Sequence, residues 1–226
     1  ICYTIPDPAR PGEYLRTHSD QHTDQHRAFL TQLSPAEQRH YLDWFATLPL
    51  WLDLGGLRVV HACWHAPSIR TVRDVCGSDR LRTDEHFLAA ARRGAPLYGA
   101  VETLLKGPEI DVPVPYFDHG RHRRTRARVR WWDSDARTLR DIADVRGMTA
   151  EGGGDYPPLP EEVVDPEHLS FVYADTVPVV YGHYWFEWDV NRDDWTERTA
   201  CVDFSAIKDG GRLVAYRWTG EPVITW

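Results

Sequence analysis

Two short apolar runs that each end in histidine constrain the fold of this chain most strongly. One is Leu57–Cys63 (LRVVHAC), which carries His61, and the other is Val177–His183 (VPVVYGH). Runs of β-branched residues favour buried strands, and Gly182 allows a close approach of backbone or ligand. Because α/β folds place their sites at the carboxyl ends of strands, we expect the two imidazoles to meet in one metal site, although about 120 residues separate them. The alternative is a pair of core histidines.

Cap and turn residues predict a helical first half and a strand-rich last third. Ser34, Pro35 and Glu37 form a capping-box pattern at the start of one helix, and the Gly55–Gly56 pair is typical of a hairpin turn. The predicted helices are residues 19–32, 34–48, 83–94 and 96–105. The predicted strands are residues 50–54, 57–63, 177–185, 199–207, 212–218 and 223–226, with a hairpin turn at 209–211. The segment 110–167 is expected to be irregular.

This order of elements predicts an α/β (α+β) layered fold in a single domain over residues 1–226, with helices mainly in the first half and antiparallel strands in the last third. A hydrophobic content of 42% suits a globular chain. The net charge of −8 argues against nucleic acid or an anionic membrane surface as the main partner. No apolar run approaches a membrane span, and cysteines without C-x-x-C spacing favour a reducing cytoplasm.

Three blocks of sequence carry a family resemblance. They are Val59-Val-His-Ala62, Tyr181-Gly-His183, and Cys201–Ser205 followed by Gly210–Arg217, which reads as a hairpin. In this order and spacing they resemble the calcineurin-like metallophosphoesterases, in the branch that holds phosphoprotein phosphatases and diadenosine tetraphosphatases. The resemblance implies a four-layer αββα sandwich, two divalent ions (manganese, iron, zinc or cobalt) and a hydroxide that attacks phosphorus. Both histidines would then bind the second metal ion.

Three further motifs of that family are absent from the chain: Asp-x-His-Gly, Gly-Asp-x-x-Asp-Arg-Gly and Gly-Asn-His-Asp/Glu. The letters of the first motif recur in Asp20-x-His22, Asp24-x-His26 and Asp84-x-His86, but none of these follows an apolar strand or precedes glycine. We therefore expect the chain to be the carboxyl-terminal portion of a longer metallophosphoesterase domain, inactive alone, with its catalytic residues upstream of Ile1.

A basic run, Arg121–Arg130, precedes Trp131 and Trp132. As a strand it would present alternate arginines on one face, where guanidinium groups bind phosphate; the alternative is a solvated edge strand. Arg130, whose plane the two tryptophans would fix, is our first choice for a substrate-phosphate contact, and Lys106 is the second.

Other aromatic and histidine residues also suggest binding. Trp64 and Trp185 follow the two strand-end histidines closely and would line a pocket for a nucleobase. His65 would either support the metal site or be exposed. A four-residue repeat would form either a metal-binding helix face or a solvated polar face; it consists of His18, His22 and His26.

Together these features predict a metal-dependent phosphoesterase that hydrolyses a phosphomonoester or a nucleotide phosphoanhydride. Its partner would be a small phosphorylated substrate, without nucleic acid or membrane. The alternative is a non-catalytic binding module that recognises an anionic partner through the segment Arg121–Trp132. A serine or cysteine hydrolase has little support, because neither a G-x-S-x-G elbow nor a convincing Cys-His pair is present.

Overall fold

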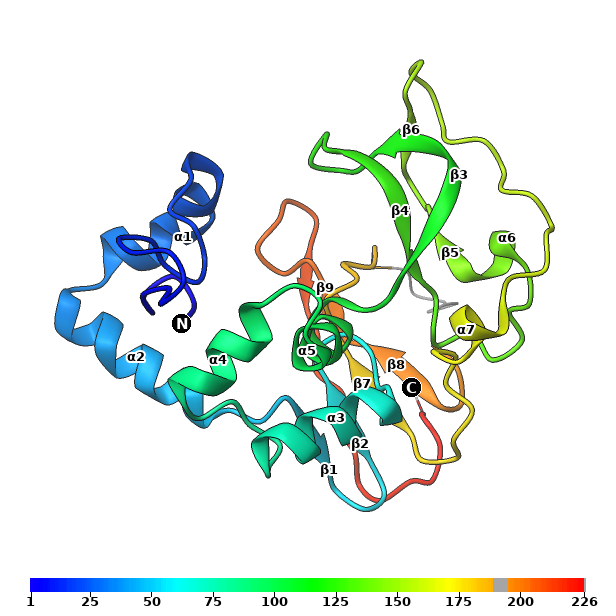
Figure 1. Ribbon diagram of the computed structural model, residues 1–226. Helices are drawn as coiled ribbons and strands as arrows, with labels where there is room; N and C mark the ends of the chain where they lie inside the picture. The colour runs from blue at the N-terminus through cyan, green and yellow to red at the C-terminus, as the bar shows by residue number, and fades with distance from the viewer. Residues whose placement is uncertain (189–194, 226) are drawn as a thin grey trace. The chain divides into compact units, whose positions relative to one another are not determined.

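The computed structural model (Figure 1) describes residues 1–188 and 195–225. The chain divides into two compact units. The first unit is Ile1–Trp51 with Ala66–Glu102, and the second is Leu52–His65 with Thr103–Trp226. The chain therefore passes between the units after Trp51, after His65 and after Glu102. The short segment Leu52–His65 belongs to the second unit although the first unit flanks it in sequence.

Helices make up most of the first unit. They are α1 (Asp20–Gln32), α2 (Pro35–Thr47), α3 (Ala66–Cys76), α4 (Asp84–Ala91) and the first part of α5 (Pro96–Lys106). The Ser34 hydroxyl accepts a hydrogen bond from the Glu37 N–H, and the Glu37 carboxylate accepts one from the Ser34 N–H, so the predicted capping box is present. The four predicted helices are confirmed, whereas α3 was not predicted. Pro67 near its start fits the first turn of a helix, where its missing N–H costs nothing.

A four-stranded sheet of order β1-β2-β7-β8 runs through the second unit, and its edge strand begins at the boundary residue Trp51. The strands are β1 (Trp51–Asp53), β2 (Arg58–Val60), β7 (Val179–Tyr181) and β8 (Thr199–Cys201). Strand β7 runs parallel to both β2 and β8, with Val59 opposite Val180 and Val180 opposite Ala200. Every residue of β7 and β8 is buried, as is usual for strands covered on both faces. The carboxyl ends of these three strands therefore lie at the same edge of the sheet.

The prediction of antiparallel strands in the last third is wrong for β7 and β8. Long connections separate β2, β7 and β8, and such crossovers allow the parallel pairing that a tight turn forbids. The antiparallel pair in this region consists of β9 (Asp203–Phe204) and β10 (Arg212–Leu213). Their connection turns where predicted, since the Gly211 N–H donates to the Lys208 carbonyl at 2.9 Å. The remaining strands are shorter than predicted. Residues 223–225 form no strand, and Trp226 lies outside the described residues.

A second sheet in this unit, of order β5-β4-β3-β6, occupies the segment that was predicted to be irregular, so that prediction is wrong. Its strands are β3 (Glu109–Phe117), β4 (Arg123–Val129), β5 (Ala143–Asp144) and β6 (Thr149–Ala150), and all neighbours are antiparallel. Figure 1 shows β3 and β4 as a long hairpin. Two short helices lie in the same part of the chain: α6 (Leu139–Ile142) between β4 and β5, and α7 (Pro166–Leu169) after β6. Because β4 lies between β5 and β3, the interpretation of the basic run as an edge strand is also wrong.

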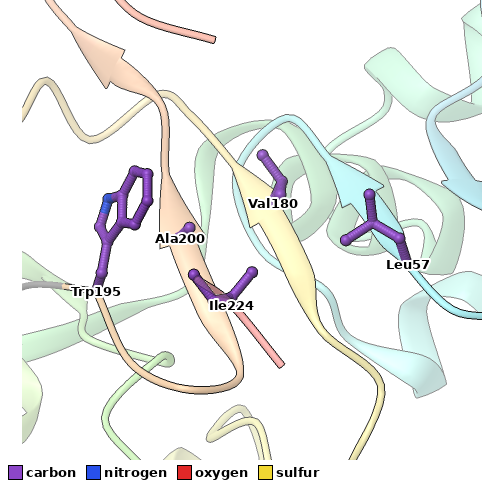
Figure 2. Close-up of a cluster of buried hydrophobic side chains, with 5 residues drawn as sticks. All are labelled: Leu57, Val180, Trp195, Ala200 and Ile224. Carbon is purple, nitrogen blue, oxygen red and sulfur yellow. The ribbon is translucent and has the colours of Figure 1, made fainter. Parts of the chain in front are cut away.

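Buried side chains on the parallel sheet form one hydrophobic cluster (Figure 2). The cluster comprises Leu57, Val180, Trp195, Ala200 and Ile224. Ile224 reaches it from the carboxyl-terminal segment, where its N–H donates to the Glu197 carbonyl at 2.9 Å. The segment predicted as a last strand is therefore held by core burial and by this hydrogen bond rather than by a strand ladder. Burying a side chain of this size contributes about 1.5–3 kcal/mol.

The described residues thus form a mixed α/β structure of the α+β kind, as predicted. Helices α1 to α5 all lie within the first 106 residues, and the helices that follow them in the described residues have four residues each. Across the described parts of the chain, none of the helices has the length and apolar character needed to cross a bilayer.

Candidate metal site

His61 and His183 lie together at the carboxyl edge of the parallel sheet, as the sequence predicted. His61 directly follows β2, and His183 follows β7 by two residues. The Gly182 N–H donates to the His61 carbonyl at 2.9 Å, which continues the pairing of the two strands beyond their ends. The centroids of the two imidazole rings are 5.2 Å apart, and the ring planes are inclined by 57°. The β2–β7 register thus brings together two side chains that are far apart in sequence.

Asp203 adds a carboxylate to this edge from the end of the third parallel strand. It follows β8 by two residues and begins β9. Its Oδ2 accepts a hydrogen bond from the backbone N–H of His183 at 3.0 Å, and its Oδ1 accepts one from the N–H of Ser205 at 3.1 Å. Its carbonyl accepts a third hydrogen bond, from the Phe186 N–H at 3.0 Å. Sequence analysis missed Asp203, although its position after a buried strand is the signal that identified the histidines.

The backbone is strained around the histidine pair. Non-glycine residues with positive φ in the described chain include His183 (72°), Trp185 (52°) and Ser205 (55°), and the fourth, Arg121, lies elsewhere in the sequence. The left-handed conformation costs a non-glycine residue about 1–2 kcal/mol. Such outliers cluster at functional sites because the surrounding structure must hold them in place. The strain therefore supports a functional interpretation of this edge.

Both imidazoles favour the neutral form. Partial burial lowers the pKa of His61, although nearby Asp203 opposes this effect. Burial, followed by the positive charges of His61 and Arg128, lowers the pKa of His183 to about 4; Asp203 acts in the opposite direction. A neutral imidazole carries the lone pair that a metal ion requires. At neutral pH the pair therefore needs no deprotonation before it binds a cation.

The donor set fits one metal ion rather than two. A divalent ion sits about 2 Å from each imidazole nitrogen, so two nitrogens that share it lie within about 4 Å of each other, which ring centroids 5.2 Å apart permit. Among residues 1–188 and 195–225, no cluster of three or more His, Cys, Asp or Glu side chains is arranged to hold a metal ion. Both carboxylate oxygens of Asp203 are already bonded to backbone N–H groups. The two-ion centre implied by the family resemblance therefore lacks further ligands in the described residues.

Two cationic side chains act on His183 in addition to the Asp203 carboxylate. Lys106 ends α5, and both its ammonium group and the Arg128 guanidinium contribute to the low pKa of His183. The Ala62 N–H donates to the Leu104 carbonyl at 3.0 Å, so the end of α5 lies against the segment that follows His61. Sequence analysis selected Lys106 as a phosphate contact, and the structure brings its charge to the pair. Arg128 was considered only as one member of the basic run.

Arg130, the first choice for a phosphate contact, lies after β4. Its N–H donates to the Ile142 carbonyl at 2.6 Å, and its guanidinium is 3.7 Å from the Asp133 carboxylate. None of the described contacts joins Arg130 to either histidine. Trp131 and Trp132 are buried against Tyr181, with ring centroids 4.7 and 5.4 Å from its ring, so they belong to the core.

Four other arginines of the basic run are paired with acids. Arg126 contacts Asp111 at 3.2 Å across the β3–β4 ladder, and Arg128 contacts Glu109 at 2.8 Å. Two further pairs, Arg124–Asp118 and Arg123–Glu151, flank them. Cross-strand pairs of opposite charge stabilise a sheet modestly. This neutralisation leaves the alternative of an anion-binding module without a described feature in its favour.

The two tryptophans predicted to line a pocket differ in exposure. Trp64 is buried, and the Arg58 guanidinium lies 4.8 Å from the centre of its ring. Trp185 is 56% exposed two residues after His183, and the Lys208 ammonium lies 3.7 Å from its ring centre. Of the two, Trp185 is the one whose side chain is open to a ligand from solvent.

The other histidines that were considered as possible metal ligands make local structural contacts. His18 precedes α1 and stacks between Tyr3 and Tyr14, with centroid distances of 3.8 and 4.2 Å. The other two bind backbone carbonyls through Nδ1: His22 binds that of Thr17 at 2.8 Å, and His26 binds that of His22 at 2.6 Å. The repeat therefore has local structural contacts in the first unit. In the second unit, His65 is partly buried and its ring packs against Phe171.

Comparisons with known proteins give no relative: no protein-family model matches the chain, and neither a curated protein nor a solved structure matches it. The resemblance to calcineurin-like metallophosphoesterases thus rests on the three sequence blocks alone.

Proposed function

We propose that this chain is part of a metal-dependent phosphoesterase with a four-layer αββα fold, in which His61 and His183 are two ligands of one divalent ion. The observation that carries the proposal is the meeting of two neutral imidazoles, 5.2 Å apart, at the ends of neighbouring parallel strands. Imidazole suits manganese, iron, zinc and cobalt.

A bound divalent ion would supply Lewis acidity, which polarises a phosphoryl oxygen and lowers the pKa of bound water. The remaining ligands would come from solvent, from a substrate oxygen or from residues outside the described parts of the chain. The second ion that the resemblance implies would have to take all of its ligands from these same sources.

The surroundings of the pair suit a phosphorylated substrate. Lys106 places positive charge near His183, which favours the oxygens of a phosphate group, whereas Arg128 shares its charge with Glu109. Trp185 offers an exposed ring two residues from His183, on which a nucleobase would stack. A phosphomonoester or a nucleotide phosphoanhydride is therefore the substrate class that we propose.

Calorimetric titration of the metal-free chain with Mn²⁺ or Co²⁺ tests the proposal. We expect His61→Ala and His183→Ala each to remove one equivalent of tight metal binding, because one imidazole alone is a weak ligand set. His40→Ala is the matched control, since His40 is exposed on α2 and should keep the wild-type stoichiometry. Unchanged stoichiometry in both site variants would remove the pair from any metal centre.

A further inference from the structure

We propose that Asp203 is the positioning residue of the histidine pair: its carboxylate fixes the backbone of His183 and so aims the imidazole at His61. The inference depends on the proposed function only in treating the positioned imidazole as a metal ligand. The positioning itself concerns hydrogen bonds within the second unit.

The contacts of Asp203 argue for positioning rather than direct ligation. A carboxylate beside two imidazoles would ordinarily be considered a third ligand. Here one oxygen accepts the His183 N–H and the other accepts the Ser205 N–H. Each of these hydrogen bonds has a charged acceptor, which makes it stronger than a neutral one. Both oxygens thus face backbone N–H groups, and no three-residue ligand group forms among the described side chains.

The two N–H groups that Asp203 binds belong to residues in strained conformations. His183 has a φ of 72° and Ser205 a φ of 55°, whereas residues with a Cβ normally avoid this region. A single carboxylate therefore bonds to two left-handed residues on two different loops. Without it, both residues would gain by relaxing toward negative φ, and relaxation at His183 would swing its ring away from His61.

Asp203 also ties the loop after β7 to the β9–β10 hairpin. Its carbonyl accepts the Phe186 N–H, so three hydrogen bonds connect this residue to residues 183–186 and to Ser205. The same hairpin carries Lys208, whose ammonium group lies 3.7 Å from the centre of the Trp185 ring. The hairpin thus supports the segment of His183 at two places, and Asp203 is its inner attachment.

The test compares Asp203→Ala and Asp203→Asn with Asp209→Asn in the full 226-residue chain. Asp209 is exposed in the same hairpin, so its variant controls for loss of one negative charge. Asparagine keeps one acceptor oxygen but replaces the other with a donor, so it should fold and yet release one N–H group. Amide hydrogen exchange and imidazole nitrogen chemical shifts, both measured by NMR without metal, report on the backbone and on the ring.

We expect Asp203→Ala to speed exchange of the His183 amide by about 10- to 100-fold and to move its ring nitrogen shifts, with a smaller effect in Asp203→Asn. Asp209→Asn should leave both unchanged. If the chain binds metal, Co²⁺ affinity in Asp203→Asn should fall by about 10- to 100-fold while the stoichiometry stays that of the wild type.

Two results would overturn the positioning role. One is unchanged His183 amide exchange and ring shifts in both Asp203 variants. The other is loss of a whole metal equivalent in Asp203→Asn, as in His183→Ala, without any change at the His183 amide, which would make Asp203 a ligand. Should wild-type protein bind no metal, the proposed function fails, yet the metal-free NMR comparison still decides whether Asp203 holds His183.

Discussion

At the scale of single residues, the state of His183 decides what the site can bind. Its ring is partly buried, and Arg128 and Lys106 add positive charge nearby, whereas Asp203 acts in the opposite direction. The protonated ring would therefore lose hydration and meet like charges. The low pKa that results keeps a lone pair available throughout the physiological range.

This state predicts a pH dependence of stability in the metal-free protein. The unfolded chain takes up a proton near the ordinary pKa of 6.5, whereas folded His183 does so near about 4, so the unfolded state binds more protons between these values. The free energy of unfolding should be unaffected above pH 6.5 and should fall as pH drops toward 4. At about 1.4 kcal/mol per pH unit, the loss attributable to this residue approaches roughly 3 kcal/mol at most, and partial solvent exposure reduces it.

Urea unfolding at pH 7 and pH 5 would measure this loss, and an NMR titration would follow the ring directly. His183→Gln should reduce the dependence, leaving the part due to His61, whose pKa is also lowered by burial, whereas His40→Gln should retain all of it. A His183 ring that titrates near 6.5 in the folded protein would contradict the assignment.

Glycines near the site show which close approaches the sequence can reveal. The sequence suggested that Gly182 permits a close approach, yet a Cβ placed there would lie 3.4 Å from the Asp203 Cβ and 3.6 Å from the His61 carbonyl oxygen, which are ordinary contact distances. The position that does require glycine is Gly107, because its φ is 76° and a Cβ there would lie 2.1 Å from the Tyr184 hydroxyl oxygen. Local sequence does not distinguish these two glycines, because the deciding neighbours are distant in the chain.

At the scale of elements, the helices were predictable and the second sheet was not. Helices such as α2 can be predicted because their capping residues, here Ser34 and Glu37, lie within four residues of the helix start. The alternating arginines of β4 made its buried residues hard to recognise in the sequence. The acidic partners of these arginines lie on β3. The pairing direction of β7 and β8 was equally hidden, because it depends on the path of the connecting chain rather than on either strand. The histidine positions were predictable because each of the two apolar runs in the sequence ends in or near a histidine.

The carboxyl-terminal segment gives an element-scale prediction. Ile224 is buried in the cluster on the parallel sheet, whereas Leu213 on β10 is 92% exposed. We expect Ile224→Ala to lower the free energy of unfolding by about 2–5 kcal/mol, because it leaves a cavity among well-packed neighbours. Leu213→Ala should change it by less than about 0.5 kcal/mol. Chemical unfolding of both variants measures the difference, and equal small effects would show that the segment does not stabilise the core.

At the scale of the whole molecule, metal binding should be visible as added stability. A ligand that binds only the folded state at a concentration 100 times its Kd raises the free energy of unfolding by about 2.7 kcal/mol. We expect this rise with Mn²⁺ or Co²⁺ in wild-type protein and in His40→Ala, measured by unfolding with and without the ion. It should be absent from His61→Ala and His183→Ala. An equal rise in those two variants would place the bound ion elsewhere.

The path of the chain through the two units limits which gene fragments can carry both histidines. His61 reaches the second unit on Leu52–His65, and the chain then runs through Ala66–Glu102 of the first unit before it returns. A gene fragment that starts at Thr103 would therefore lack β2, a neighbour of β7 in the parallel sheet, together with one of the two imidazoles. A recombination breakpoint anywhere between codons 66 and 102 would separate the codon for His61 from the codon for His183. A single continuous stretch of coding sequence that carries both imidazoles must consequently also carry residues 66–102 of the first unit.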